Sequence, residues 1–487
     1  MTMQDSAPFA SRPGGLPFAL TILFRIAGLA SLAMLLVFPI YKSRLEGFVP
    51  LIVSAFVVWM VLSKTPVVIT FRKSFCAAIG RPSPRRFLAL TLGVPILLQV
   101  GLVFWLRPAP SFDGLFVLQE AGHLARTGLM SPLTYYAPGQ IWYYGLLFKM
   151  FGATPVAAQL GQLPLFLGMI LVFHGIARRA LSLTAARVAT LAMAFYPSMI
   201  LYALITPYYF YLYTLMILIM VGRWLAVATN IGGLVSAFAG GLAAGFGALT
   251  KAVLLVAPVQ ALAFWLLSAR SFFQRRLWAA WLLFVLGMGV IITPWAWRNR
   301  QIFGEPILVC TSGPLVLFSA NNPESDGLYS PLPDETLIET PEEMLRHMRF
   351  CRDHAKAFIL HHPDQFLRLA LRKLLHTWGT ETSYVELINQ GGEAIPKLDP
   401  ALRFIAQTGW GVLVMLWALI GLRALAQRRP ASPIELATAI LVLTKWVVYS
   451  FYEGGARHHL PAVPLLILYV VSALSAPPWR RDAPVPS

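Results

Sequence analysis

Charged residues are scarce in this chain of 487 residues: Asp, Glu, Lys and Arg together make up only 12% of it. A soluble domain carries about 25%. The scarcity therefore excludes an ordinary soluble domain. The chain is 57% hydrophobic, and apolar runs near the length of a membrane span recur from end to end. This pattern indicates a polytopic helical membrane protein.

Negatively charged residues are scarcer than positively charged ones. The chain has 21 Asp and Glu against 39 Lys and Arg, which gives a formal net charge of +18. An excess of this kind is also found in nucleic-acid-binding proteins, but here the basic residues form no stripe and no recognisable nucleic-acid module. They are scattered between apolar runs, as the positive-inside rule predicts for cytoplasmic loops. We expect the bilayer, and no nucleic acid, as a partner.

Cysteine is also rare, with three residues in the chain: Cys76, Cys310 and Cys351. We expect Cys76 on the cytoplasmic side and the other two in one outer loop. Sequence separation gives no geometry, so whether Cys310 and Cys351 pair stays open.

The order of the first spans sets the predicted topology. Residues 18–40 are apolar for longer than a signal-peptide core and lack a convincing cleavage site, which predicts a retained span. Residues 48–62 return to the cytoplasm. The densest basic loop follows, with Lys64, Arg72, Lys73, Arg81, Arg85 and Arg86. Residues 87–106 then carry the chain to the outer side.

The rest of the chain predicts nine more spans, at residues 155–176, 184–202, 208–225, 231–249, 252–267, 277–297, 404–422, 434–450 and 460–476. We therefore expect an all-α polytopic membrane fold of about twelve transmembrane helices, with both termini cytoplasmic. Residues 138–152 are apolar but short, which is typical of a juxtamembrane helix.

The predicted organisation has four parts. Residues 1–86 form an N-terminal pair of helices with a basic loop, and residues 87–297 form a transmembrane core with a first outer loop at 107–154. Residues 298–402 form a small non-cytoplasmic subdomain, in which residues 341–375 read as one helix. Residues 403–487 hold the last spans and a cytoplasmic tail. His347, His354 and His361 repeat every seven residues, about 10 Å apart on a helix, which favours an ordinary helix face over a metal site.

Asp113 is the first acidic residue after Glu46, and it stands just beyond the span at residues 87–106. A carboxylate at a membrane boundary costs free energy unless water, a partner or a substrate meets it, which makes Asp113 a functional candidate. The alternative is a solvated aspartate that caps a helix.

Several motifs resemble a known family. The spacing of Asp113, Phe116, Ala121, Leu124 and Gly128, followed by the helix at 138–152, resembles the first outer loop of the GT-C superfamily of polytopic glycosyltransferases. The likeness is greatest to the protein O-mannosyltransferase and aminoarabinose transferase branch, which takes sugars from polyprenyl phosphate carriers. Further matches are at residues 249–251, 294–300, 319–327 and 457–464. The two leading spans lie outside the resemblance.

The resemblance implies an inverting sugar transfer on the non-cytoplasmic face, with Asp113 as general base and Glu120 as a possible supporting acid. Displacement from a polyprenyl phosphate needs one base and cations for the leaving phosphate, and no close carboxylate pair. The candidate phosphate-binding cations are Lys251, Arg298, Arg300 and Arg457. Candidate sugar-binding residues are Tyr136, Asn321, Asn322, Asp326 and His458. Lipid headgroup binding or snorkelling is the alternative for Arg298 and Arg300.

The sequence departs from the family pattern at one position that bears on metal binding. Many relatives carry an acid in the outer turn that here reads Ile205 to Phe210, with no carboxylate. A hard divalent cation prefers several charged oxygen ligands. We therefore expect turnover with no metal and no other cofactor, the lipid-linked sugar being the donor substrate.

Two alternatives stay open: an oligosaccharide ligase or polymerase that uses lipid-linked glycans, and a lipid-sugar flippase or transporter. A transporter more often carries ionisable or helix-breaking residues deep within paired spans. We expect a bacterial inner (plasma) membrane protein of the cell envelope, with a periplasmic site. The sugar, the acceptor (lipid, glycan or protein), the carrier length and the oligomeric state stay open.

Overall fold

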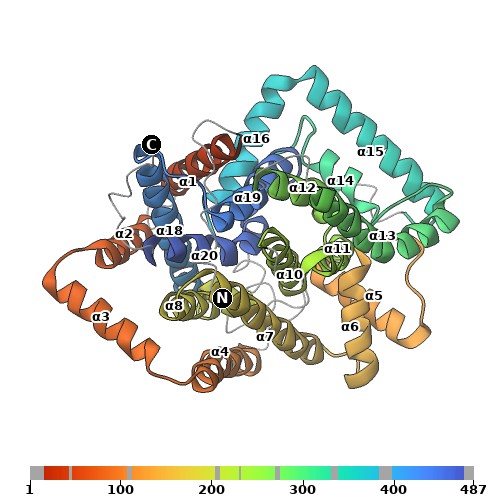
Figure 1. Cartoon of the computed structure of the whole chain (residues 1–487). Coiled ribbons are helices and arrows are strands. Elements are labelled where there is room, and N and C mark those ends of the chain that lie inside the picture. Colours follow the sequence, from red (N-terminus) through yellow and green to blue (C-terminus); the bar gives the residue numbers. More distant parts are fainter. Residues whose placement is uncertain are drawn as a thin grey trace.

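The computed structural model describes residues 16–42, 47–106, 112–202, 209–229, 232–268, 275–330, 338–382 and 398–475. Within these ranges the regular elements are all α-helices or 3-10 helices (Figure 1). The predicted all-α membrane fold is confirmed. Nine of the described helical segments are long and apolar enough to cross a membrane, and α2 (Phe48–Leu62) with α3 (Pro66–Gly80) makes a tenth candidate that is bent by 81°.

The long apolar helices follow the predicted spans closely. They are α1 (Leu16–Tyr41), α4 (Pro84–Leu106), α7 (Pro155–Ala180), α10 (Phe210–Ala228), α11 (Gly233–Thr250), α13 (Arg275–Phe303), α18 (Asp399–Ala426), α19 (Pro433–Phe451) and α20 (Val463–Ser475). The short turns η5 (Ala456–His458) and η6 (Leu460–Ala462) lead directly into α20.

Two predicted spans are shorter helices. Residues 184–202 divide into α8 (Leu183–Ala194) and α9 (Pro197–Leu201), because Pro197 cannot continue the preceding helix. Residues 252–267 divide into η3 (Ala252–Val256) and α12 (Ala257–Ser268). With these two segments and the bent pair, each of the twelve predicted segments is helical.

The helix predicted over residues 138–152 is confirmed as α6 (Pro138–Phe151), which begins with proline at its first turn. Its position at the membrane surface stays a prediction. It packs on α5 (Phe112–Thr127), and the two share an apolar core that includes Val117, Ala121, Ile141 and Tyr144. Residues 107–154 were predicted as the first outer loop, and the described part of this stretch is largely a pair of helices.

Two expectations need correction. The single helix predicted over residues 341–375 is wrong: α15 (Pro341–His361) ends before α16 (Pro363–Trp378) begins. Pro363 has no backbone N–H and holds His362 out of the helical conformation, at φ −127° and ψ 57°. The stretch predicted as a basic loop also contains α3. The remaining described helix is α14 (Ser312–Ser319).

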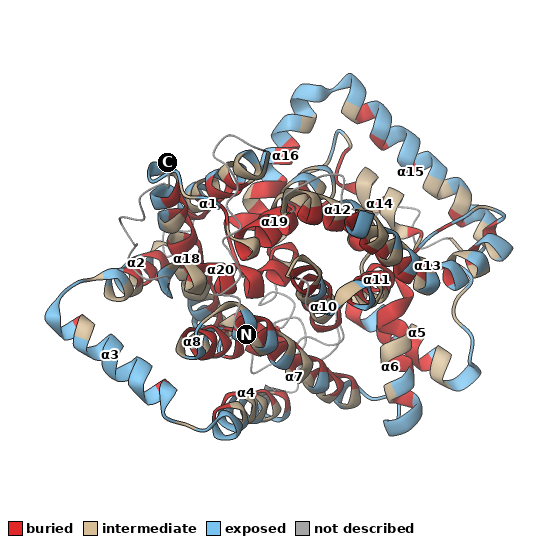
Figure 2. Cartoon of the chain, in the orientation of Figure 1, coloured by how far each residue is buried: buried red, intermediate tan, exposed pale blue. Residues whose placement is uncertain are grey.

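The two leading helices are part of the bundle, since α1 and α2 both pack on α18 and α1 also packs on α19. Inside this contact Arg25 donates from Nε to Glu435 Oε1 at 2.8 Å, and the Arg25 side chain is fully buried. Burial is densest along α10, α19 and α20, whereas α3 and α15 are mostly exposed (Figure 2).

Candidate active site

Asp113 lies in the first turn of α5, where a carboxylate is favoured by the helix dipole. Its side chain is half-buried, and the Tyr136 hydroxyl donates to Oδ1 at 3.3 Å. The Tyr136 ring stacks on Phe116, one helical turn from Asp113, with ring centroids 6.4 Å apart. The segment that leads into α6 therefore holds the carboxylate in place.

Gly139 connects this helix pair to the end of α11. A Cβ at Gly139 would lie 2.6 Å from Thr250 Oγ1 and 3.0 Å from the Leu249 carbonyl oxygen, so the backbones of α6 and α11 approach too closely for any side chain. Lys251 follows Thr250 directly as the C-cap of α11. The structure thus places the segment that holds Asp113 against the segment that carries Lys251.

Lys251 is half-buried, and its Nζ lies 4.4 Å from the centroid of the Tyr209 ring. Such a cation–π contact stabilises a charge without neutralising it. Glu453 is an electrostatic neighbour of Lys251. Lys251 thus lies between the α5–α6 pair and the connection from α19 to α20.

Glu453 is the acidic centre of that connection. Its Oε1 accepts from Arg457 at 2.5 Å and lies 3.3 Å from His458 Nε2. Burial alone raises the pKa of the Glu453 carboxyl, but Arg457, His458 and Lys251 outweigh it and hold the pKa well below its usual range. The group is a fixed carboxylate at neutral pH.

Lys373, on α16, contacts the start of the connection between α19 and α20. Its fully buried Nζ donates to Asn321 Oδ1 at 2.6 Å, to the Phe451 carbonyl at 3.0 Å and to the Ser450 carbonyl at 3.4 Å. Burial lowers the pKa of Lys373 to about 7. Lys373 therefore joins α16 and the residue Asn321 to the end of α19.

Arg298 has a set of acceptors of its own. It donates to Thr134 Oγ1 at 3.0 Å, Asn299 Oδ1 at 3.1 Å, the Met130 carbonyl at 3.2 Å and the Ser131 carbonyl at 3.0 Å. These contacts hold the α5–α6 connection on α13.

Arg300 is exposed and lies two positions after Arg298 on the same helix. That spacing is about 200° around the helix, so the two side chains point to opposite faces. The structure does not bring Arg298 and Arg300 to one point, contrary to what a shared phosphate site requires.

The other predicted sugar-binding residues are engaged within the fold. The Asn321 amide donates to the carbonyls of Leu317 at 2.7 Å and Phe451 at 2.6 Å, and its oxygen accepts from Lys373. Asn322 donates to two carbonyls of α14, and Asp326 accepts the Leu328 N–H at 2.8 Å. His458 is buried and stacks on Tyr449, with centroids 4.0 Å apart. Of the predicted set, Tyr136 contacts Asp113.

Glu120 lies two turns along α5 from Asp113, and its Oε2 accepts the Ser131 N–H at 3.2 Å. Glu120 therefore positions the connection between α5 and α6, which Arg298 also contacts. Among the described residues, no three His, Cys, Asp or Glu side chains gather as a metal site. In the turn on which the metal prediction depends, residues 205–208 lie outside the described part of the chain.

Cys310 and Cys351 are not joined by a disulfide. Cys310 Sγ lies 3.4 Å from Ser312 Oγ, and burial raises the pKa of its thiol.

Lys373, Glu453 and Lys445 are the site residues that sequence reasoning missed. Lys445 lies within α19, where its buried Nζ donates to the His458 carbonyl at 3.0 Å. A charged residue inside an apolar span is the signal that could have revealed it. Lys373 and Glu453 have no comparable signal, because their partners are distant in the chain.

No protein-family model matches the chain, and no curated protein matches its sequence. Its structure is similar to that of ArnT from Cupriavidus metallidurans bound to undecaprenyl phosphate, at 16% identity and a TM-score of 0.42, over 81% of this chain and 77% of ArnT. It is also similar to the oligosaccharyltransferase AglB from Archaeoglobus fulgidus in complex with an inhibitory peptide and a dolichol-phosphate, at 14% identity and a TM-score of 0.45, over 80% of this chain and 50% of AglB.

An Archaeoglobus fulgidus oligosaccharyltransferase tethered to an acceptor peptide is similar at 12% identity and a TM-score of 0.33, over 80% of this chain and 55% of that one. ArnT and AglB are GT-C membrane glycosyltransferases, the class that the motifs of this chain resemble. The likeness is one of helix arrangement, and the chain spans about half the length of the archaeal proteins.

Proposed function

We propose that this chain is a GT-C-type membrane glycosyltransferase that moves a sugar from a polyprenyl phosphate carrier to an acceptor hydroxyl. The observation that carries the proposal is the path from Asp113 through Tyr136 and α6 to Lys251. Tyr136 donates to Asp113, and Gly139 contacts the residues directly before Lys251. A base and a cation on adjoining segments are what displacement from a sugar phosphate requires.

In this reaction the Asp113 carboxylate takes the acceptor hydroxyl proton as the hydroxyl oxygen forms its bond to the anomeric carbon. The bond from that carbon to the phosphate oxygen breaks, and the electron pair leaves on polyprenyl phosphate. The configuration at carbon inverts because one displacement occurs. General base catalysis of this kind contributes about a hundredfold or more to the rate.

Lys251 and Arg457 are the cations that we assign first to the leaving phosphate, because both lie beside Glu453 at this end of the bundle. Glu453 holds Arg457 in a fixed direction. A fixed ammonium and guanidinium stabilise the charge that develops on the phosphate without reorganising. Arg298 is assigned to positioning the segment before α6, and Arg300 to a supporting contact with the phosphate.

We further propose that transfer needs no divalent metal, because Lys251 and Arg457 supply positive charge at the phosphate. Turnover in excess chelator supports this assignment. Activity that is lost in chelator and restored by magnesium or manganese overturns it and makes Asp113 a metal ligand. The proposed location is a plasma membrane of the cell envelope, with the Asp113 side facing away from the cytoplasm.

Mass spectrometry of the lipid that copurifies with the full chain tests the proposed donor. We expect polyprenyl phosphate or its glycosylated form to be enriched over the total membrane lipid. Purified protein in proteoliposomes should then release polyprenyl phosphate from the sugar-linked lipid in the presence of acceptor. Movement of intact sugar-linked lipid between leaflets, with no cleavage, identifies a flippase instead.

A further inference from the structure

Helix α3 lies across the direction of the membrane helices. The chain leaves α2 at Leu62, passes through extended Thr65 at ψ 144°, and starts α3 at Pro66, with 81° between the two helices. Figure 1 shows α3 at the edge of the molecule, between α2 and α4. Because α2 is apolar and packs on the apolar helix α18, this bend turns α3 away from the direction of both helices.

Helix α3 has the composition of an interfacial helix. Val67, Phe71 and Phe75 are 78%, 62% and 46% exposed, and their spacing of four residues places them on one face. Phe71 and Phe75 stack with centroids 6.2 Å apart. Arg72 and Lys73 follow Phe71 directly and are exposed. Exposed aromatic rings next to basic side chains are typical of helices that lie at the headgroup level.

The charge around α3 has a single sign. No Asp or Glu occurs between Glu46 and Asp113 in the sequence. The six basic residues between positions 64 and 86 are all exposed: Lys64, Arg72, Lys73, Arg81, Arg85 and Arg86. With no acidic side chain nearby in sequence to neutralise them, these cations complement anionic lipid headgroups.

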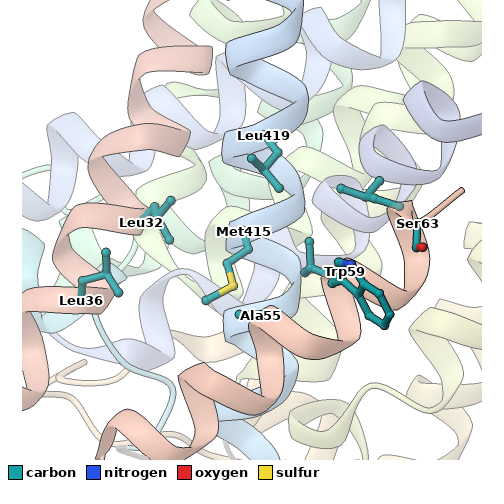
Figure 3. Close-up of a pocket in the computed structure, with 9 residues that line it drawn as sticks. Leu32, Leu36, Ala55, Trp59, Ser63, Met415 and Leu419 are labelled. Atoms are coloured by element: carbon teal, nitrogen blue, oxygen red, sulfur yellow. The ribbon is translucent and has the colours of Figure 1, made fainter. Parts of the chain in front are cut away.

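An apolar groove of about 510 Å³ lies between α1, α2 and α18 beside this corner. Figure 3 shows Leu36, Ala55, Trp59 and Met415 along it, with Ser63 at one end. Trp59 is 52% exposed, so the groove is open to the surroundings of the bundle. Side chains that face it are apolar apart from Ser63 and the Trp59 indole N–H, which suits a hydrocarbon chain.

Arg72 joins the basic surface to the groove. Its Nη1 donates to the Val61 carbonyl at 2.7 Å, next to the groove residue Leu62. Lys64 follows Ser63 directly. Arg72 is therefore held where the groove meets the start of α3, and Lys64 lies next to the groove in sequence.

We propose that this corner binds an anionic phospholipid, with one acyl chain in the groove and the phosphate against Lys64, Arg72 and Lys73. The site belongs to α1, α2, α3 and the part of α18 that lines the groove, and α3 lies across the bundle from α5 and α6 (Figure 1). It is therefore separate from the proposed donor site. The bound lipid fixes the angle between α2 and α3 and fills the apolar surface that α1, α2 and α18 leave open.

Native mass spectrometry of the full chain tests the proposal. The protein is incubated in detergent with equal amounts of phosphatidylglycerol and phosphatidylcholine, and the retained lipid is counted. We expect phosphatidylglycerol to be retained in preference. The triple variant Lys64→Gln, Arg72→Gln, Lys73→Gln should lose that preference by at least about fivefold. The matched control Arg178→Gln, Arg179→Gln, an exposed pair at the end of α7, should keep it.

A second variant tests the groove with all charges intact. Ala55 is exposed in the groove, so Ala55→Phe should fill the groove without disturbing the core. We expect Ala55→Phe to reduce phosphatidylglycerol retention while its melting temperature stays at the wild-type value. Equal retention of the two phospholipids by the wild type overturns the proposal. So does unchanged retention in the triple variant, or displacement of phosphatidylglycerol by polyprenyl phosphate at equal concentration.

Discussion

The Glu453 carboxylate accepts a hydrogen bond at 2.5 Å from the Arg457 guanidinium, four residues further along the connection between α19 and α20. Glu453 is 5% exposed, so the pair is largely withdrawn from water. Removing one partner of such a pair leaves an uncompensated buried charge, which costs about 3–5 kcal/mol.

Glu453→Gln should therefore lower the melting temperature by several degrees, as measured by intrinsic fluorescence in detergent. The matched control is Glu324→Gln, at an exposed position, which should melt like the wild type. Because the folded pKa of Glu453 lies below its unfolded value, its contribution is present above about pH 4.3 and is lost as the pH falls through the folded pKa. Equal melting temperatures for Glu453→Gln and Glu324→Gln at pH 7 contradict this assignment.

Lys373 gives stability a pH dependence of the opposite kind. Burial lowers its folded pKa to about 7, whereas a lysine in the unfolded chain titrates near 10.4. Between these values the unfolded chain binds more protons, so the stability of the wild type rises with pH across this window.

The melting temperature of the wild type, relative to Lys373→Met, should accordingly increase from pH 7 to about pH 9.5. Lys356→Met, at an exposed position of α15, serves as the matched control and should show a constant difference from the wild type. A difference between wild type and Lys373→Met that stays constant with pH rules out a lowered pKa at Lys373.

Lys251 is half-buried, whereas Arg300 is exposed. We therefore expect their substitutions to change the affinity for polyprenyl phosphate by different amounts. Lys251→Gln should weaken the binding of bare polyprenyl phosphate by about tenfold or more, because a charged contact to phosphate is lost. Arg300→Gln should have a smaller effect, because Arg300 is exposed on the face of α13 opposite Arg298. Isothermal titration with polyprenyl phosphate measures both. Unchanged affinity in Lys251→Gln would contradict the assignment of Lys251 to the phosphate.

The predicted topology is testable with a cysteine that the chain already contains. Cys76 is exposed on α3, and the topology places it in the cytoplasm. In intact cells an impermeant maleimide should leave Cys76 unlabelled until the membrane is opened. Ser330→Cys in a Cys76→Ser background should label from outside. Labelling in the reverse order contradicts the orientation of the whole bundle.

Most of the fold was predictable because its signals are local. Long apolar runs predicted the nine long spans, and the short run between Pro138 and Gly152 predicted α6. The break before Pro363 was missed, although its signal is local: the residue before a proline is disfavoured in the helical conformation. Helix α3 was missed because its basic residues were taken only as a topology signal.

The site was less predictable because its contacts join distant parts of the chain. Asp113 was identified by its position at a span end, but nothing local shows that Tyr136 holds it. Arg298 and Arg300 were grouped by proximity in sequence, although the helix turns them apart. The contacts of Lys251 with Tyr209 and of Lys373 with Asn321 depend on the packing of whole helices.

The turnover of Asp113→Asn tests the central claim most directly. The variant keeps the size of the side chain and an oxygen that can accept from Tyr136, but it cannot take a proton at neutral pH. We predict wild-type binding of polyprenyl phosphate and a fall in transfer rate on the order of a hundredfold or more in proteoliposomes. Glu120→Gln is the matched control and should retain most of its turnover. Near-normal turnover in Asp113→Asn, with loss in Glu120→Gln, would contradict the assignment of Asp113 as the base.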